Sequence, residues 1–205
     1  LLELPIVVIG GITPDNAAGH FGLALVSVAK GQYGKALDHY RAARERAPDS
    51  VDILYNMGVC HARLNQLHDA ERLFNEVIRL DSTHLRSYLN CGAIAERYRR
   101  LSDAGYYWRK AVELAPKWAD PRNRLGLVYY RQENYDQAIE ELKQAVALDD
   151  TNADSWNNLG LAYQGRRDYR QALKCFQKAH DLDRHNWIIL NNLGGVCGIH
   201  GPKRR

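Results

Sequence analysis

The sequence predicts an all-α fold in which pairs of helices repeat along the chain. Three observations support this prediction: a fixed period of 34 residues, small residues that keep this period, and bulky residues spaced as on one helix face. The period is clearest in a column of glycines at Gly58, Gly92, Gly126, Gly160 and Gly194. Three further columns, described below for the second helix, keep the same period. Four columns with one period are not expected by chance, so the repeat is the basis of the fold.

The first helix of each unit is indicated by apolar residues around the glycine. Trp156, Leu159, Gly160 and Tyr163 follow the spacing i, i+3, i+4, i+7, which places them on one face of a helix. We expect Gly160 to lie where a side chain would push the second helix away.

The second helix is indicated by a stripe of small and bulky residues. Ala172, Phe176 and Ala179 follow the spacing i, i+4, i+7, and the small residue permits a close approach while Phe176 fills the gap beyond it. The equivalent residues of the other units are Ala36, Tyr40 and Ala43; Ala70, Phe74 and Val77; Ala104, Trp108 and Ala111; and Ala138, Leu142 and Ala145.

Turn residues and prolines divide the chain into units. Gly31, Asn134 and Asp168 precede a tyrosine that starts the second helix, and Pro48 and Pro116 end a unit because proline cannot continue a helix interior. The predicted array covers residues 17–200, with units 17–50, 51–84, 85–118, 119–152 and 153–186 and a final helix at 187–199. Residues 1–16 are a non-repeat segment, and residues 201–205 form a basic tail.

These motif residues resemble the signature of the tetratricopeptide repeat family. The resemblance implies a right-handed superhelix, an α-solenoid, whose concave wall is formed by the first helix of each unit. It also implies a scaffold whose groove binds a protein or an extended peptide. The sequence departs from the family pattern at Ser82, Asp150 and Arg184, where proline is common, and at Ala24, which replaces glycine.

The sixth position of each unit is predicted to project into the groove. It holds Asn56, Asn90, Arg124, Asn158 and Asn192. An asparagine amide both donates and accepts hydrogen bonds, so a ladder of them could pair with a peptide backbone. The alternative is that these amides bond neighbouring helices or local backbone. Further candidates on the same wall are Tyr55, Asn123 and Asn157.

A second column consists of arginines near the end of the first helix: Arg63, Arg97 and Arg131. They could select an acidic segment or a free carboxylate. The alternative is that they only complement the helix dipole. Asp52, Asp120 and Asp154 at the start of these helices dilute the positive field.

Residues 5–17 do not follow the repeat and resemble the phosphate loop of thiamine-phosphate synthase, a (β/α)₈ barrel enzyme. Residues 22–30 also resemble the strand that follows this loop in that family. We favour a helix there, because Gly31, Tyr33, Ala36 and Tyr40 support the repeat. We assign no catalysis to the segment. The resemblance could be a coincidence or the relic of a fusion, and the segment could be disordered or pack as a cap on the array.

Composition limits the other functions. The formal net charge is +4, of which the tail residues Lys203, Arg204 and Arg205 supply three, so we expect no nucleic-acid surface. Four widely spaced cysteines predict packed thiols in a reducing compartment, the cytoplasm, without a metal site. We expect no cofactor, no membrane span and no enzyme activity, since no catalytic motif is present. Alternatives to peptide binding are a self-assembly module or the regulatory arm of a larger enzyme.

Overall fold

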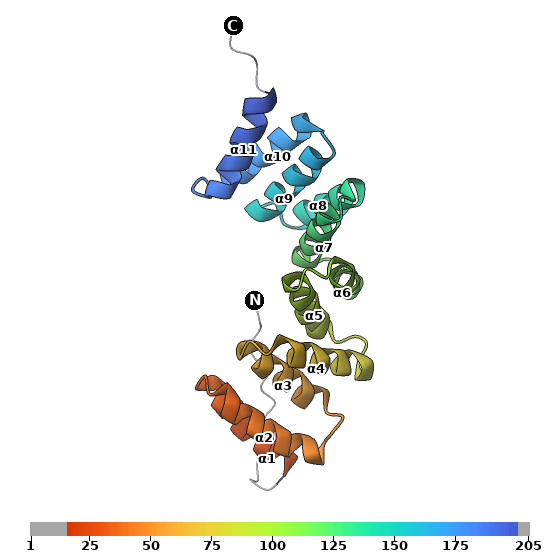
Figure 1. Ribbon diagram of the computed structural model, residues 1–205, viewed down its shortest axis with the longest axis vertical. Helices are drawn as coiled ribbons and strands as arrows, with labels where there is room; N and C mark the ends of the chain where they lie inside the picture. The colour runs from red at the N-terminus through yellow and green to blue at the C-terminus, as the bar shows by residue number, and fades with distance from the viewer. Residues whose placement is uncertain (1–15, 201–205) are drawn as a thin grey trace. The chain divides into compact units, whose positions relative to one another are not determined.

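The computed structural model describes residues 16–200, and the side chains of residues 16–196. All regular structure in this range is helical, which confirms the predicted all-α class (Figure 1). The helices are α1 (Ala17–Ala29), α2 (Tyr33–Arg46), α3 (Val51–Arg63), α4 (Leu67–Leu80), α5 (Leu85–Arg97), α6 (Leu101–Leu114), α7 (Ala119–Arg131), α8 (Tyr135–Leu148), α9 (Ala153–Gly165), α10 (Tyr169–Leu182) and α11 (Trp187–His200). The first helices begin at residues 17, 51, 85, 119, 153 and 187, which is the period of the sequence columns.

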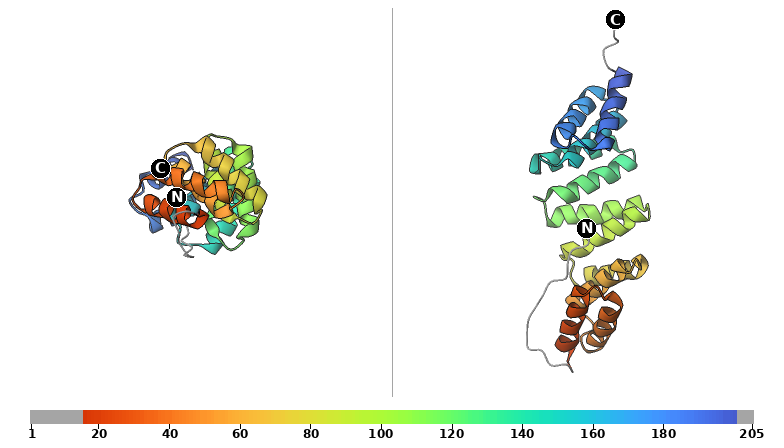
Figure 2. Two further views of the ribbon diagram at one scale, coloured as in Figure 1. Left: turned by 90° about the horizontal axis from the view of Figure 1, so that it is seen from below. Right: turned by 90° about the vertical axis from the view of Figure 1, so that its left-hand side faces the viewer.

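The chain divides into two compact units, Leu1–Ile94 and Ala95–Arg205, with the boundary inside α5. In the first unit α1 pairs with α2, α3 pairs with α4, and α2 packs against α3. In the second unit α7 pairs with α8 and α9 with α10, while α6 packs on α7, α8 on α9 and α10 on α11 (Figures 1 and 2). Each unit therefore contains complete helix pairs of the predicted kind.

Close packing inside the pair requires glycine at Gly58, Gly126 and Gly160, whereas a Cβ atom on Gly194 in α11 would meet no atom within 4 Å. A Cβ atom on Gly160 would lie 2.6 Å from the Phe176 ring, and one on Gly58 would lie 2.6 Å from the Phe74 ring. Carbon atoms do not approach so closely without displacement of one of the groups. The glycine on the first helix and the bulky residue on the second therefore form one matched contact, as the sequence predicted.

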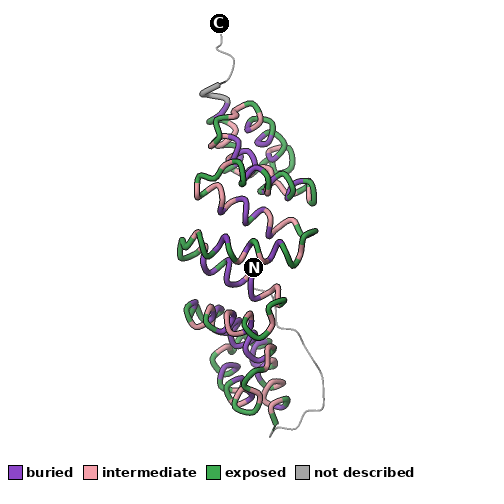
Figure 3. The backbone as a smooth tube through the Cα atoms, turned by 90° about the vertical axis from the view of Figure 1, so that its right-hand side faces the viewer, coloured by how far each residue is buried: buried purple, intermediate pink, exposed green. Residues whose placement is uncertain are grey.

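The predicted stripe of the second helix forms the core of both units. Ala172, Phe176 and Ala179 are completely buried, and Phe74 in the first unit is equally buried. In the second unit the core continues into α11 through Val196, which belongs to the same cluster as Phe176. Buried residues recur at helical spacing along the helices (Figure 3).

The turn within each pair uses one residue with a left-handed backbone. Gly31 has φ of 71°, and the residues at the same position in later pairs are Asn65 (61°), Arg99 (55°), Glu133 (62°) and Arg167 (65°). Glycine and asparagine adopt this conformation readily, whereas the other three side chains disfavour it. The sequence pattern indicated only Gly31, because the other residue types give no signal of the backbone they must adopt.

Side-chain caps fix the start of several first helices. The side chains of Asn16, Ser50 and Asn152 accept hydrogen bonds from Gly19 N, Ile53 N and Ser155 N. Since α1 runs to Ala29, residues 22–29 are helical rather than a strand. The rest of the segment that resembles a phosphate loop, residues 5–15, lies outside the described residues.

Candidate functional site

Asn90, Asn158 and Asn192 of the predicted groove belong to polar pairs that join successive first helices. In the second unit Asn158 Nδ2 donates to Asn123 Oδ1 at 3.0 Å, and Asn192 Nδ2 donates to Asn157 Oδ1 at 2.9 Å. Each bond joins the sixth position of one repeat to the fifth position of the repeat before it. The amides thus bond neighbouring helices, which was one of the two alternatives drawn from the sequence.

These pairs leave part of each outer amide unused. Asn158 and Asn192 are half-buried, and each commits one N–H to its partner. An asparagine amide has two N–H donors and one oxygen acceptor, so a second N–H and the carbonyl oxygen remain on each residue. The helix-to-helix bond fixes the orientation of the amide without exhausting it.

In the first unit the same pairing has a different chemistry and is more deeply buried. Asn90 Nδ2 donates to the hydroxyl oxygen of Tyr55 at 3.4 Å, and the two residues are 7% and 3% exposed. The Tyr55 ring packs against His84 and Phe74, with ring centroids 4.8 and 5.6 Å away. Little of this pair is accessible to a ligand.

Asn56 has no such partner. The residue 35 positions earlier is Phe21, which has no polar group, and the Asn56 amide donates instead to the carbonyl oxygen of Asp52 at 2.8 Å. Its own Oδ1 is buried without a hydrogen-bond partner, and the residue is only 3% exposed. An unsatisfied buried oxygen destabilises the fold, so this position lacks the arrangement found in the second unit.

Arg124, at the same position in α7, is exposed and lies 3.6 Å from Asp120 one turn earlier. This exposed pair leaves the guanidinium accessible. Such a surface pair contributes only about 0–1 kcal/mol to stability.

Two members of the arginine column line one pocket in the second unit. Arg97 and Arg131, with Arg99, Glu96 and Leu101, surround a space of about 450 Å³. Arg131 pairs with Glu96 at 3.2 Å, and the same carboxylate accepts from Trp108 Nε1 at 2.7 Å. Arg97 and Arg99 form no ion pair with any described residue. The pocket therefore presents two uncompensated guanidinium groups. Arg63, the third member of the column, is exposed at the end of α3 in the first unit.

The remaining predictions concern cysteines, metals and membranes. Cys60, Cys91 and Cys175 form no disulfide and are buried, and burial raises the pKa of the Cys60 thiol to about 12. A thiol with such a pKa is an inert packed group. Among the residues that the structure describes, no three His, Cys, Asp or Glu side chains are placed to hold a metal. No described helix is long and apolar enough to cross a bilayer.

The register of the polar pairs was missed by the sequence prediction. Residues of one column lie 34 positions apart, whereas the bonds join residues 35 apart in neighbouring columns. The signal was present in the sequence, because Asn123 and Asn157 immediately precede the sixth position of their repeats.

Comparison with known families identifies tetratricopeptide repeats in both units. A tetratricopeptide repeat model matches residues 27–88, a second matches residues 153–186, and a TPR repeat model matches residues 128–165. These ranges include the helix pairs whose contacts are described above.

Curated relatives match over part of their length. The chain is 28% identical over 110 residues to BBSome complex member BBS4 of Bos taurus, covering 54% of this chain and 21% of that protein. It is 33% identical over 90 residues to the human protein O-mannosyl-transferase TMTC2, covering 42% of this chain and 11% of that protein. Photosystem I assembly protein Ycf3 of Rippkaea orientalis is 32% identical over 106 residues, which cover 43% of this chain and 61% of Ycf3. The chain thus spans about a fifth or less of the first two relatives.

Solved structures share the fold over most of the chain. YrrB, described as a TPR protein with an unusual peptide-binding site, superposes with a TM-score of 0.80 at 20% identity, covering 87% of this chain and 92% of YrrB. MamA of Desulfovibrio magneticus RS-1 superposes with a TM-score of 0.76 at 24% identity, covering 84% and 97% of the two chains. At this level of identity the similarity establishes the helical-repeat fold.

Proposed function

We propose that this chain, which is built from tetratricopeptide repeats, is a scaffold that binds an extended protein segment along its first helices. The observation that carries the proposal is the row of oriented amides at Asn158 and Asn192 in the second unit. The groove positions of the first unit contribute less, because Tyr55 and Asn56 are each only 3% exposed.

The spacing of the row suits an extended backbone. Packed helices lie about 8–10 Å apart, and an extended chain advances about 3.3 Å per residue. Successive amides would therefore meet a bound peptide about every third residue. Each would offer one donor and one acceptor to a backbone that needs both.

The pocket at Arg97 and Arg99 gives the bound segment a preferred charge. Both guanidinium groups lack an ion pair among the described residues, while the charge of Arg131 is matched by Glu96. A guanidinium binds a carboxylate in a two-bond geometry that lysine cannot reproduce. We therefore infer that an acidic residue of the segment binds there.

Similar proteins support this class of function. The description of YrrB gives that protein a peptide-binding site, and those of BBS4 and Ycf3 give them a complex and an assembly role. Each of these roles requires contact with another protein. The similarity to these proteins does not identify the ligand of this chain.

The test begins with selection of binders from a library of linear peptides. The affinity of a selected peptide is then measured for the chain and for the Asn158→Ala, Asn192→Ala double variant by calorimetry. We expect a loss of about tenfold or more, because a hydrogen bond contributes about 0.5–1.5 kcal/mol and tenfold corresponds to 1.4 kcal/mol.

The matched control is Asn134→Ala, which removes an exposed amide from a turn of the second unit that forms no side-chain cap. It should leave the affinity unchanged. Equal affinity of the Asn158, Asn192 double variant, with only its melting temperature lowered, would show that the amides serve the fold alone.

A further inference from the structure

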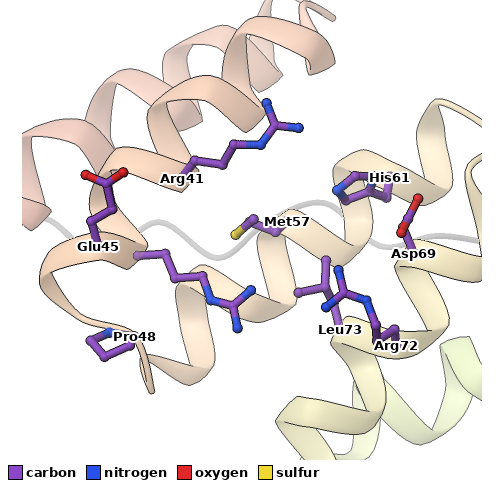
Figure 4. A pocket seen from close by; sticks show the side chains of 9 residues that line it. Arg41, Glu45, Pro48, Met57, His61, Asp69, Arg72 and Leu73 are labelled. Atoms are coloured by element: carbon purple, nitrogen blue, oxygen red, sulfur yellow. The ribbon is translucent and has the colours of Figure 1, made fainter.

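A second pocket, separate from the predicted groove, lies in the first unit. It has a volume of about 660 Å³ and is formed by α2, α3 and α4 (Figure 4). This volume lies in the range of small-ligand and side-chain binding sites. Its lining residues are Arg41, Arg44, Glu45, Pro48, Met57, His61, Asp69, Arg72 and Leu73.

The residues of α3 that line the pocket lie on a different face of the helix from the predicted groove positions. The pocket residues Met57 and His61 are one turn apart and share one face of α3. The groove positions Asn56 and Arg63 are seven residues, or two turns, apart and share another face. Consecutive positions of a helix are about 100° apart, so the two faces diverge by roughly that angle. A ligand in this pocket would not touch the groove positions of the same helix.

The floor of the pocket is apolar. Met57 and Leu73 contribute to the lining although they are only 5% and 1% exposed, so a narrow strip of hydrocarbon is accessible between the charged residues. Methionine adapts its shape to varied apolar partners. This floor suits one aliphatic side chain.

Guanidinium groups surround this floor. Arg72 forms no ion pair or hydrogen bond with a described residue, and Arg41 forms only an exposed pair with Asp38, at 2.9 Å. In Figure 4 the Arg72 side chain extends toward Met57, and the Arg41 guanidinium lies above Met57 and points away from it. Glu45 lies at the opposite end of the pocket from Asp69. Arg44 is held in place by Glu76 at 2.5 Å.

The acidic lining residues are fewer than the three arginines. Glu45 on α2 is exposed, Asp69 on α4 is half-buried, and neither forms an ion pair with a described residue. An exposed arginine pair such as Arg41–Asp38 contributes about 0–1 kcal/mol and can be exchanged for a ligand carboxylate. Two guanidinium groups are thus available on either side of an apolar strip.

We propose that this pocket binds a short acidic peptide segment in which an aliphatic side chain is flanked by carboxylates. The aliphatic group lies on Met57 and Leu73, and the carboxylates bind Arg41 and Arg72. Charge-assisted bonds between guanidinium and carboxylate are among the strong hydrogen bonds of proteins. The segment belongs to a partner protein and adds a second contact to the chain, independent of the groove.

The sequence provides a direct reporter, since it contains a single methionine, Met57, on the pocket floor. Protein labelled with ¹³C in the methionine methyl group gives one such signal from this sequence, and its assignment is checked with Met57→Leu. The probe is a short synthetic peptide with a leucine between two glutamates. We expect titration to shift the Met57 signal to saturation, and a peptide with lysines in place of the glutamates to leave it unchanged.

Charge reversal supplies the decisive control. Arg72→Glu should weaken binding of the acidic peptide at least tenfold, whereas Arg79→Glu, an exposed arginine on the same helix outside the pocket, should weaken it less than twofold. The Arg41→Glu, Arg72→Glu double variant should instead bind the lysine peptide. The proposal is overturned if the Met57 signal does not respond, or if Arg72→Glu and Arg79→Glu behave alike. It is also overturned if Arg97→Glu, Arg99→Glu abolishes binding instead, since the peptide then occupies the other basic pocket.

Discussion

The two units use the same hydrogen-bond register with different chemistry. In the second unit the sixth-position amide of one repeat meets an asparagine of the repeat before it, at 3.0 and 2.9 Å, and the outer amide is half-buried. In the first unit Asn90 meets a tyrosine hydroxyl at 3.4 Å, and both groups are buried. The register is thus a feature of the repeat, whereas the polar groups left for a ligand depend on which residue occupies the fifth position.

This difference separates two roles that the sequence column combined. An asparagine can join helices and still bind a ligand only where its own amide stays partly exposed. Asn158 and Asn192 meet this condition, whereas Asn56 and Asn90 are almost fully enclosed. Four predictions test how far the units are alike and where they differ.

The largest effect is expected in the core, where the units should be alike. Phe74 and Phe176 are both completely buried against the glycine of the first helix. Replacing either by alanine should lower the free energy of unfolding by about 3–5 kcal/mol, since it leaves a cavity. Urea unfolding followed by circular dichroism measures the loss. A loss below about 1 kcal/mol for one of them would show that the units are not built alike.

The polar pairs should show the difference between the units. In a double-mutant cycle with Asn123→Ala and Asn158→Ala we expect a coupling energy of about 0.5–1.5 kcal/mol. The cycle with Tyr55→Phe and Asn90→Ala should give less, because its bond is longer. A larger coupling energy for Tyr55 and Asn90 than for Asn123 and Asn158 would contradict the order expected from the two bond lengths.

Replacing a turn residue by glycine should change the free energy of unfolding according to how well the original residue tolerates a left-handed backbone. Glu133→Gly removes a disfavoured conformation and should raise the free energy of unfolding by about 0.5–1 kcal/mol, less than the strain itself because glycine also loosens the unfolded chain. Asn65→Gly should change it by a smaller amount, since asparagine tolerates this backbone. Thermal melts of the two variants measure the contrast. A stabilisation by Asn65→Gly that matched or exceeded that by Glu133→Gly would contradict it.

The smallest effect is a pH dependence confined to the first unit. His84 Nδ1 accepts from Ser87 N at 3.3 Å, as Asn152 accepts from Ser155 N in the second unit. Burial lowers the pKa of His84 below 6.5, so the unfolded chain binds the proton more readily. The contribution of neutral His84 to the free energy of unfolding is therefore complete above pH 6.5, and it decreases as the pH falls below that value.

His84→Asn keeps the cap without a titrating group and should flatten this part of the pH profile. Melting temperatures between neutral and mildly acidic pH measure the change. If the variant keeps the full slope, other groups are responsible.

The sequence predicts the helix pairs well because the repeat shows the same packing contact several times. Gly160 with Phe176 and Gly58 with Phe74 stand in the same two columns of the repeat, so their contact could be expected from the spacing alone. Turn geometry at Arg99, Glu133 and Arg167 was not predictable, because the fold forces these residues into a conformation that their type disfavours. The pairing of Asn158 with Asn123 was missed because it joins two different columns.

The pockets were only partly predictable. The arginine column indicated Arg97 and Arg131, but Arg99 entered the pocket from a turn that has no helical periodicity. The pocket over Met57 combines α2, α3 and α4, and its residues share no period in the sequence.

The proposal that amides of the second unit bind a peptide backbone can be tested at the atoms concerned. ¹⁵N-labelled protein shows the side-chain N–H signals of Asn158 and Asn192, assigned with the two alanine variants. Titration with a peptide selected from the library should shift both pairs of signals and leave that of Asn134 in place. If the peptide binds while the Asn158 and Asn192 signals stay unchanged, the row of amides serves only to join the helices.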